Sequence, residues 1–215
     1  MKGLNVRSVK DRLYYVTRED AFKVLEACPD AQRRLVFALA RFGGLRIPSE
    51  LAIKLVDIDW EHDRITVHSP KTEHHEGGES RQIPIFPELR PYLEEVWEAA
   101  PEGEEFLLEP RYRAKEVNLG TQMNRIIQRA GLKPWPKTFQ NCRSTRETEL
   151  AQEWPIHLVC KWIGNTLDVA REHYLQVRDE DFAKASRYST KYSAKYDAAA
   201  IGRLGHIQAR NDASP

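Results

Sequence analysis

The feature that most constrains the fold is a change in hydrophobic period between Asp57 and Pro87. On either side of this stretch, apolar residues recur every three or four positions, as on one face of an α-helix. Within it, they alternate with polar residues in three short runs, which are Ile58 with Trp60, Ile65 with Val67, and Ile83 with Ile85. The connections, residues 61–63 and 69–80, contain no helical crossover, so the runs predict antiparallel strands. We therefore predict an α+β fold that is mostly helical, with a small three-stranded antiparallel sheet inserted early.

Helices are predicted before and after this sheet from the same periodicity. Thr17 and Asp20 approximate a capping box and start a first helix, a second follows Pro29-Asp30 and ends at Gly43-Gly44, and Pro48 is placed to start a third. Later helices are predicted over residues 87–97, 117–130, 141–152, 155–162, 167–173 and 180–186. We interpret residues 1–16 as a lead-in segment or linker, in which residues 13–16 form a lead-in strand or docking arm. We interpret residues 17–187 as one domain and 188–215 as a loosely held tail with at most one helix.

The composition excludes several classes of protein. No apolar run approaches the length of a membrane span, and the first residues do not form a secretory signal. Three well-separated cysteines, Cys28, Cys142 and Cys160, are typical of a reducing compartment, so we expect a cytoplasmic protein without disulfides. His74-His75-Glu76 invites a metal interpretation, but adjacent histidines in a glycine-rich loop are usually solvated, and we predict no metal site.

Charge is segregated along the chain although the net charge is only +1. Residues 88–109 hold eight acidic residues against Arg90, whereas residues 111–146 hold nine basic residues against Glu116. Such a chain can carry a phosphate-binding face while remaining nearly neutral. The alternative is a solvated basic helix, which the charge pattern alone leaves open.

Four short motifs place polar residues at helix ends and on a loop. They are GGLRIPSEL at residues 43–51, SPKT at 69–72, QNCR at 140–143, and GN at 164–165 followed nine positions later by a tyrosine. In this order the chain resembles the tyrosine recombinase family, also called phage-type integrases, over nearly its whole length. The resemblance gives the candidate catalytic residues Arg46, Lys71, Gln140, Arg143, Asn165 and Tyr174.

The roles that the resemblance implies suit the chemistry of a phosphodiester. Two guanidiniums, Arg46 and Arg143, are expected to hold the non-bridging oxygens, on which charge develops during attack. Lys71 is expected to protonate the departing 5′ oxygen as general acid. Tyr174 would attack phosphorus and form a 3′-phosphotyrosyl bond, which conserves the bond energy, so no ATP, metal or other cofactor is expected.

Three positions depart from the family pattern. Gln140 and Asn165 stand where the family usually has histidine; both amides can donate hydrogen bonds, but neither can act as a base near neutral pH. Loss of general-base catalysis costs about 10²–10⁴-fold. One extra residue also separates Arg46 from Glu50. A catalytically impaired DNA-binding relic of the same fold therefore remains an alternative to an active recombinase, as does an unrelated helical DNA-binding regulator.

Each candidate also has a structural interpretation. Arg46 could be only an ion-pair partner of Glu50, Arg143 could pair with Glu147 one turn later on its helix, and Tyr174 could be a core aromatic.

The resemblance further implies double-stranded DNA as partner and a tetramer on paired sites, with the tail passed to a neighbouring subunit. Residues 1–16 are too short for the family's N-terminal clamp domain, so we expect a fragment or a short member.

Overall fold

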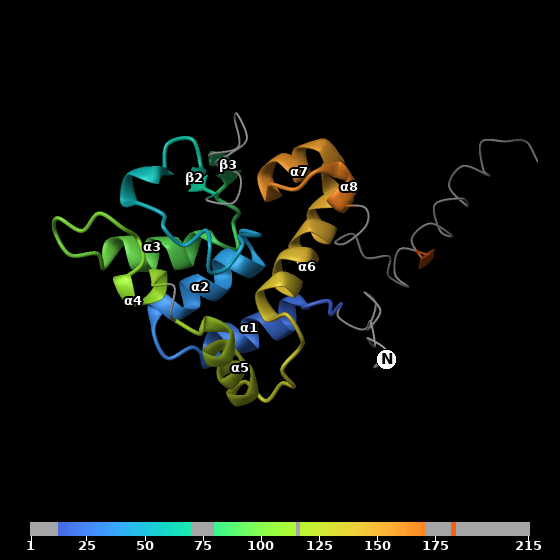
Figure 1. The fold of residues 1–215 in the computed structure, drawn as a ribbon, viewed down its shortest axis with the longest axis horizontal. Helices are drawn as coiled ribbons and strands as arrows, with labels where there is room; N and C mark the ends of the chain where they lie inside the picture. The colour runs from blue at the N-terminus through green and yellow to red at the C-terminus, as the bar shows by residue number, and fades with distance from the viewer. Residues whose placement is uncertain (1–12, 70–79, 115–116, 171–181, 184–215) are drawn as a thin grey trace, which may run out of the picture. The chain divides into compact units, whose positions relative to one another are not determined.

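The computed structural model describes residues 13–69, 80–114, 117–170 and 182–183. Its internal contacts divide the chain into two units, Met1–Gln176 and Val177–Pro215, and the description below concerns the first. Nearly all the described elements belong to this unit (Figure 1). Lys71, His74, His75, Glu76 and Tyr174 lie outside the described residues.

The described elements are mostly helical and enclose one small sheet. In chain order they are α1 (Arg18–Ala27), α2 (Ala31–Arg41), the 3₁₀ turn η2 (Leu55–Asp57), β1 (Ile58–Asp59), β2 (Arg64–His68), β3 (Ser80–Pro84), α3 (Arg90–Glu98), α4 (Pro110–Arg113), α5 (Leu119–Arg129), α6 (Thr138–Glu153), α7 (Ile156–Ile163) and α8 (Leu167–Val169). This is the predicted α+β fold.

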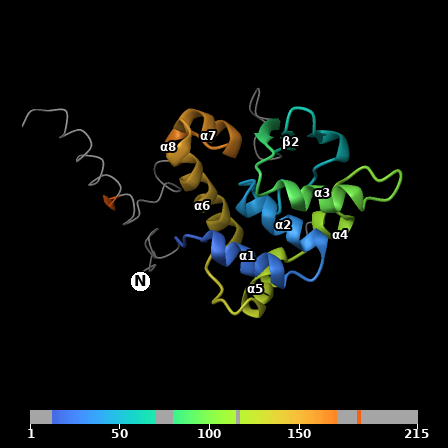
Figure 2. The same ribbon diagram turned by 180° about the vertical axis from the view of Figure 1, so that it is seen from behind.

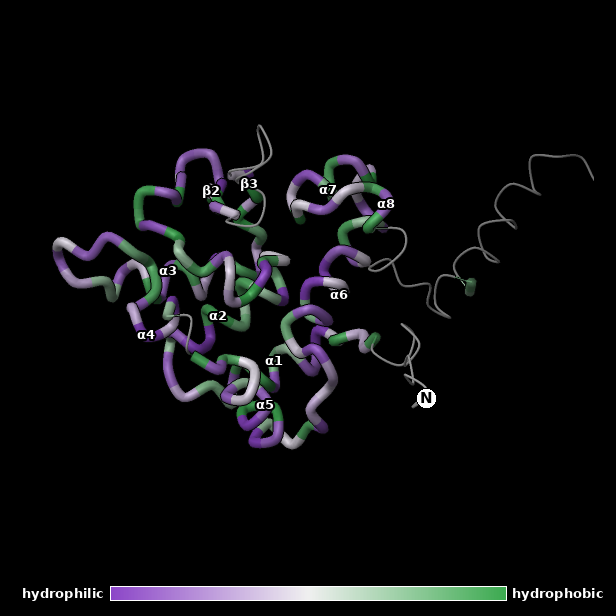
Figure 3. Tube along the Cα trace, in the orientation of Figure 1, coloured by the Kyte–Doolittle hydropathy of each residue, from purple (hydrophilic) through white to green (hydrophobic). Residues whose placement is uncertain are grey.

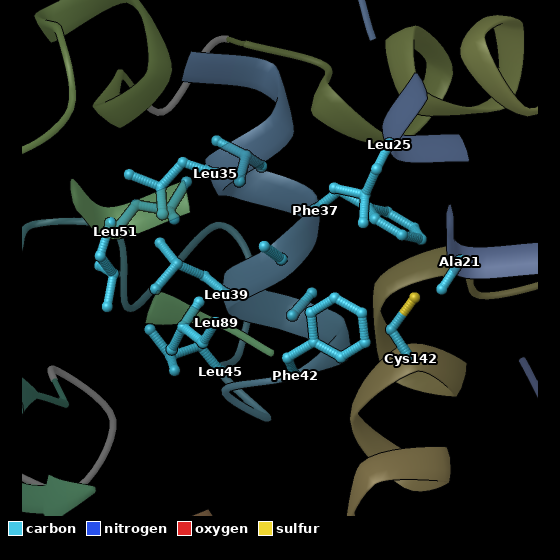
Figure 4. Packing of buried hydrophobic residues seen from close by; sticks show 14 of the residues in the cluster. Ala21, Leu25, Leu35, Phe37, Leu39, Phe42, Leu45, Leu51, Leu89 and Cys142 are labelled. Carbon is cyan, nitrogen blue, oxygen red and sulfur yellow. The ribbon is translucent and has the colours of Figure 1, made fainter. Parts of the chain in front are cut away.

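Helix α2 is the centre of the hydrophobic core. Every residue from Leu35 to Arg41 is buried, so both sides of the helix pack against other elements. Figure 4 shows Leu35 and Leu39 grouped with Leu89 on one side, and Phe37 directed to the side of α1 and α6. A helix that is buried on all sides needs a layer on each face. Here α3 packs on one side, and α1 and α6 pack on others.

Helix α6 is polar in sequence but buried in the structure. Figure 3 shows that much of its length is hydrophilic. Nevertheless most of its residues from Thr138 to Leu150 are buried, among them Arg143, Arg146 and Glu147. Buried charges must be paired or hydrogen-bonded, because desolvation is costly. The polar residues of α6 therefore require partners from neighbouring elements, and these partners form the site described below.

The predicted sheet is confirmed, with strand order β1-β2-β3 and both pairs antiparallel. Ile65 pairs with Ile83, and both side chains are buried on the same face. Both views place α7 at one end of α6 (Figures 1 and 2). Helix α7 also packs against β3. This packing brings the end of α7 next to Arg81 of β3, whose Nε donates to the carbonyl of Trp162.

The predicted helix beginning at Pro48 is wrong. Residues 47–50 form a turn and residues 51–53 are extended. The backbone here is used for tertiary pairing: Leu107 N–H donates to the carbonyl of Ile53, and Leu55 N–H donates to the carbonyl of Glu105. Leu51 and Ile53 are still buried, but from an extended segment. Pairing with the segment around Phe106 therefore outweighed the local helix signals.

Two smaller predictions at the chain's edges have clear outcomes. Residues 13–16 form no strand, but they dock on α6, because the backbone N–H groups of Tyr14 and Val16 donate to the side chains of Asn141 and Thr145. The Thr17 cap of α1 is confirmed, with its hydroxyl accepting from the Asp20 N–H at 3.1 Å.

In the described part of the chain, no helix has the length and apolar character that crossing a membrane requires.

Candidate functional site

Two arginines from distant parts of the chain meet at one acceptor atom. Arg46 Nη2 donates to Oδ1 of Asn165 at 2.9 Å, and Arg143 Nη2 donates to the same oxygen at 2.8 Å. Arg46 follows α2, Arg143 lies in the first half of α6, and Asn165 follows α7. Two guanidiniums directed at one oxygen form a site for an anion, because each carries a fixed charge and several donors.

The glycines of the motifs allow this convergence. Gly44 has φ +70°, and a Cβ there would lie 2.4 Å from Cδ1 of Ile163. A side chain would therefore be both strained and blocked at this position. The close approach lets the Gly44 carbonyl accept from Arg143 Nη1 at 2.6 Å. Gly164 has φ +79° and ends α7, and its carbonyl accepts from Arg46 Nη2. Both turns thus present backbone carbonyls to the arginines.

Glu50 holds Arg46, the more exposed of the two arginines, in place. Its carboxylate is buried, with 2% of the residue exposed, and accepts from both Nη1 and the backbone N–H of Arg46, at 2.9 and 2.7 Å. Arg81 from β3 donates to both carboxylate oxygens at 2.7 Å. Burial acts to raise the pKa of Glu50, but Arg81, the Arg46 N–H and Arg143 outweigh it and lower the pKa to about 2. Glu50 is therefore ionised throughout the physiological range.

Arg143 is as deeply buried as Glu50. Only 2% of it is exposed, and burial together with the neighbouring Arg46 charge lowers its pKa to about 9. Its acceptors among the described residues are the neutral oxygens of Gly44 and Asn165, and its Nε has no hydrogen-bond partner there. A buried cation with a free donor and no carboxylate of its own favours an anionic ligand.

Asn165 is oriented by a buried acid. Its Nδ2 donates to Oε2 of Glu147 at 2.9 Å, which directs its Oδ1 toward the two arginines. Burial raises the pKa of Glu147, although the Asn165 hydrogen bond and the charges of Arg143 and Arg46 act in the opposite direction. Oε1 of Glu147 has no hydrogen-bond partner in the described part of the chain. The amide oxygen therefore occupies the point at which a ligand oxygen would meet both guanidiniums.

A cavity of about 830 Å³ opens beside this cluster, between β2, β3 and α7. Its lining includes Arg46 and Asn165 at the cluster, and the further cations Arg64, Arg81 and Lys161 against the single carboxylate of Asp63. A cleft lined mostly by one sign of charge raises the local concentration of the opposite ion. An anion can thus reach the site through a cavity that is lined mainly by positively charged residues.

The structure brings together three of the six predicted site residues: Arg46, Arg143 and Asn165. Gln140 lies on α6 three residues before Arg143 and its side chain is exposed. The predicted positions of Lys71 and Tyr174 stay predictions, since both lie outside the described residues. The ion pair of Arg46 with Glu50 exists, but it leaves Nη2 of Arg46 for Asn165. Glu147 accepts from Asn165, and the structure describes no ion pair between it and Arg143.

Arg81 and the role of Glu147 were not predicted from the motifs. Arg81 could have been found, because it shares the alternating face of Ile83 and Ile85, so a charged residue is directed to the buried side of β3. Glu147 gave no comparable signal, since α6 has no clear apolar stripe from which to read its orientation. In the described part of the chain, no group of three acidic, histidine or cysteine side chains could hold a metal.

The predicted basic face of residues 111–146 is not a single surface. Arg143 and Arg146 are buried, and Arg146 lies over the ring of Phe86 at 4.1 Å from its centroid. The guanidinium of Arg113 stacks on Phe106 at 3.8 Å. Packing of α6 on α2 therefore moves part of the positive charge into the interior, where Arg143 belongs to the site and Arg146 pairs with Glu88 and Glu149.

The sequence comparisons assign this arrangement to a family. Residues 14–181 match the model of the phage integrase family, so the chain belongs to that family, whose members are the tyrosine recombinases. A curated relative is Tyrosine recombinase XerA of Thermococcus onnurineus (strain NA1), 24% identical over 177 residues. The match covers 79% of this chain and 60% of the relative, so the chain spans less than two thirds of the relative's length.

Solved structures of the family share the fold. The crystal structure of XerA recombinase superposes with a TM-score of 0.66 at 17% identity, covering 82% of this chain and 65% of that one. The Tn1549 transposon integrase (residues 82–397), in complex with circular intermediate DNA, gives 0.62 at 17% identity, with 85% and 66% covered. A lambda integrase dimer bound to a COC′ core site gives 0.56 at 20% identity, with 78% and 63% covered.

Proposed function

We propose that the chain carries out site-specific DNA recombination, by cleavage and rejoining through a 3′-phosphotyrosyl intermediate. Arg46 and Arg143 bind the scissile phosphate, Tyr174 attacks it, and Lys71 protonates the departing 5′ oxygen. Gln140 and Asn165 supply hydrogen bonds to the phosphate in place of the family's histidines. The reaction needs no metal or nucleotide, because the phosphotyrosyl ester retains the bond energy for the second strand.

The observation that supports this proposal best is the convergence of two guanidiniums on Oδ1 of Asn165, at 2.9 and 2.8 Å. A non-bridging phosphate oxygen at that point would accept from both. Rotation of the Asn165 amide would then turn its Nδ2 from Glu147 toward the phosphate. Because the donors are already placed by Glu50 and Gly44, little reorganisation accompanies charge development.

The test is covalent trapping on a nicked suicide substrate. A duplex with a nick beside the cleavage position loses a short fragment after attack, so the protein–DNA adduct accumulates and is measured by denaturing gel. We expect an adduct with the wild-type protein and none with Tyr174→Phe, while both bind the duplex equally. An adduct that persists in Tyr174→Phe would contradict the assignment of the nucleophile.

A second candidate is the catalytically impaired relic, and one observation favours it. Glu147 holds the Asn165 amide with its acceptor, not its donor, facing the arginines. A side chain locked in this way would compete with the phosphate. Duplex binding without any adduct, in the wild type and in Asn165→His alike, would support the relic. An adduct formed by the wild type would exclude it.

The remaining assignments follow from the recombination proposal. Residues 17–187 would form the catalytic domain, residues 1–16 the lead-in segment, and residues 188–215 the tail. Double-stranded DNA is the substrate, which fits a cytoplasmic location, and cleavage of paired sites calls for a tetramer on DNA. Analytical ultracentrifugation with a synapsed DNA substrate tests this last point, since a complex that stays at one protein per duplex would contradict the tetramer.

A further inference from the structure

Arg81 is a nearly buried arginine that belongs to none of the motifs named above. It lies on β3 with 10% of its side chain exposed. Its Nη1 and Nη2 donate to Oε1 and Oε2 of Glu50, both at 2.7 Å, so the pair is bidentate. Such a fork fixes the plane of a carboxylate as well as its position. Arg81 therefore determines how Glu50 presents its oxygens to other donors.

The other donors to Glu50 include the phosphate-site arginine itself. Arg46 contacts both carboxylate oxygens, through Nη1 at 2.9 Å and through its backbone N–H at 2.7 Å. Ser69, which follows β2 directly, donates to Oε1 at 2.8 Å. Nη1 of Arg81 also lies 2.8 Å from the Ser69 hydroxyl. Glu50 thus joins Arg46 to the residue after β2 and to β3.

A second connection runs from Arg81 to the end of α7. Its Nε donates to the carbonyl of Trp162 at 2.7 Å. A Cβ on Gly164 would lie 3.1 Å from both Cδ and Nε of Arg81, so the backbone of Gly164 packs directly against this side chain. The adjacent residue is Asn165, and the Gly164 carbonyl accepts from Arg46. Arg81 therefore holds two of the three segments that meet at the anion site.

We propose that Arg81 is a positioning residue of the phosphate site, which acts through Glu50 on Arg46 and through the Trp162–Gly164 backbone on Asn165. This inference rests on the proposed function, and it adds a residue that does not touch the phosphate. Without Arg81, Glu50 can rotate away from Arg46, and the end of α7 loses its tie to β3. The guanidinium of Arg46 would then no longer meet that of Arg143 at one point.

The chain provides a matched control in Arg41. Its Nη1 and Nη2 donate to both oxygens of Glu149 at 2.9 and 2.6 Å, and its Nε donates to the carbonyl of Val16 at 3.0 Å. Arg41 is fully buried, and its carboxylate partner makes no contact with Arg46 among the described residues. Substitution of Arg41 thus removes the same set of hydrogen bonds from a place that serves only the fold.

The experiment compares Arg81→Lys and Arg81→Gln with Arg41→Lys and Arg41→Gln in single-turnover cleavage of the nicked substrate at saturating DNA. The amplitude of adduct formation reports the folded fraction, whereas the rate constant reports the geometry of the site. We expect lower amplitude or Tm in both series. Only the Arg81 series should lose rate, by about 10²-fold in Arg81→Gln and less in Arg81→Lys, since small misplacements at a reacting centre cost that much.

Binding of inorganic phosphate separates this inference from the proposed function. Phosphate titrations followed by NMR of the arginine Nε–H signals should show an affinity about tenfold weaker in Arg81→Gln and unchanged in Arg41→Gln. A tenfold decrease is the size of effect expected when the charged hydrogen bond of Arg46 to phosphate is weakened. If the wild type binds phosphate or cleaves DNA and the Arg81 variants match the Arg41 variants in both assays, the inference is wrong. A wild-type protein that does neither contradicts the proposed function and the inference together.

Discussion

Arg41 and Arg81 make nearly the same hydrogen bonds in two regions of the molecule. Each forms a bidentate pair with a carboxylate, Glu149 or Glu50, and each donates through Nε to a backbone carbonyl. The regions differ in what surrounds the carboxylate. We call them the Glu149 cluster, which contains Arg18, Arg41, Glu88, Arg146 and Glu149, and the Glu50 cluster, which contains Arg46, Glu50, Ser69, Arg81, Arg143, Glu147 and Asn165.

In the Glu149 cluster, each arginine lies within ion-pair distance of a carboxylate. Arg146 reaches both Glu149 at 3.4 Å and Glu88 at 3.5 Å. In the Glu50 cluster, Arg143 has only neutral acceptors among the described residues, and Arg46 directs one nitrogen at the same neutral oxygen. Similar ion pairs thus stabilise the fold in one place and leave positive charge available for a ligand in the other.

The largest expected effect comes from replacing each cluster's α6 arginine with a side chain of similar length. Arg143→Met should lower the rate of adduct formation by about 10³-fold, because one of two phosphate donors is lost. Arg146→Met should leave the rate per active molecule unchanged and lower the free energy of unfolding by about 3 kcal/mol, because the partly buried carboxylates of Glu88 and Glu149 lose a buried partner. Single-turnover cleavage and urea unfolding measure the two effects. Equal loss of rate in both variants would remove the distinction between the clusters.

Acid should weaken the Glu50 cluster over a defined range. The pKa of Glu50 is lowered from 4.5 to about 2, so its ionised form stabilises the fold above the unfolded pKa and this contribution is lost as pH falls toward 2. This pKa shift corresponds to a contribution of about 3 kcal/mol to the free energy of unfolding. Urea unfolding between pH 7 and 2 should show this decrease in the wild type. Glu50→Gln should be less stable near neutrality and lack that part of the slope; the same slope in both would exclude Glu50 as its source.

A smaller effect is expected from adding a methyl group where the turn after α2 approaches Ile163 of α7. Gly44→Ala should lower the free energy of unfolding by about 2 kcal/mol, because the residue has φ +70° and its Cβ would meet Ile163 at 2.4 Å. Gly120→Ala is the control, since this glycine lies in α5 with its nearest neighbour at 3.7 Å. It should stabilise the helix by about 0.5–1 kcal/mol. If Gly44→Ala left the free energy of unfolding unchanged, the contact between Gly44 and Ile163 of α7 would not be tight.

The sequence predicted those parts of the fold that depend on local pattern. The alternation of Ile65 with Val67 indicated β2, and the apolar spacing of Met123, Ile126 and Ile127 indicated α5. The helix at Pro48 failed because pairing of Ile53 and Leu55 with residues 105–107 outweighed a local start signal. Such pairing joins positions some fifty residues apart, so it cannot be predicted from the sequence pattern around Pro48.

For the site, the family resemblance pointed to Arg46, Arg143 and Asn165, which the structure brings together, but it did not indicate which residues support them. The hydrogen bonds of Arg81 to Glu50 and of Asn165 to Glu147 depend on how β3, α6 and α7 pack. A pattern of residue types records which groups are present, whereas the direction of each donor follows from tertiary structure. The alternation of β3 could have placed Arg81 on the buried side of the sheet, but its pairing with Glu50 and that of Asn165 with Glu147 follow only from the tertiary structure.

The central claim is that Arg46 and Arg143 bind one phosphate of the DNA at the position now held by Oδ1 of Asn165. A crystal structure of Tyr174→Phe with an intact duplex site tests this directly. We expect one backbone phosphate with hydrogen bonds from both guanidiniums and the Asn165 amide turned toward it. A scissile phosphate that contacts neither guanidinium, with Oδ1 of Asn165 still between them, would contradict the account.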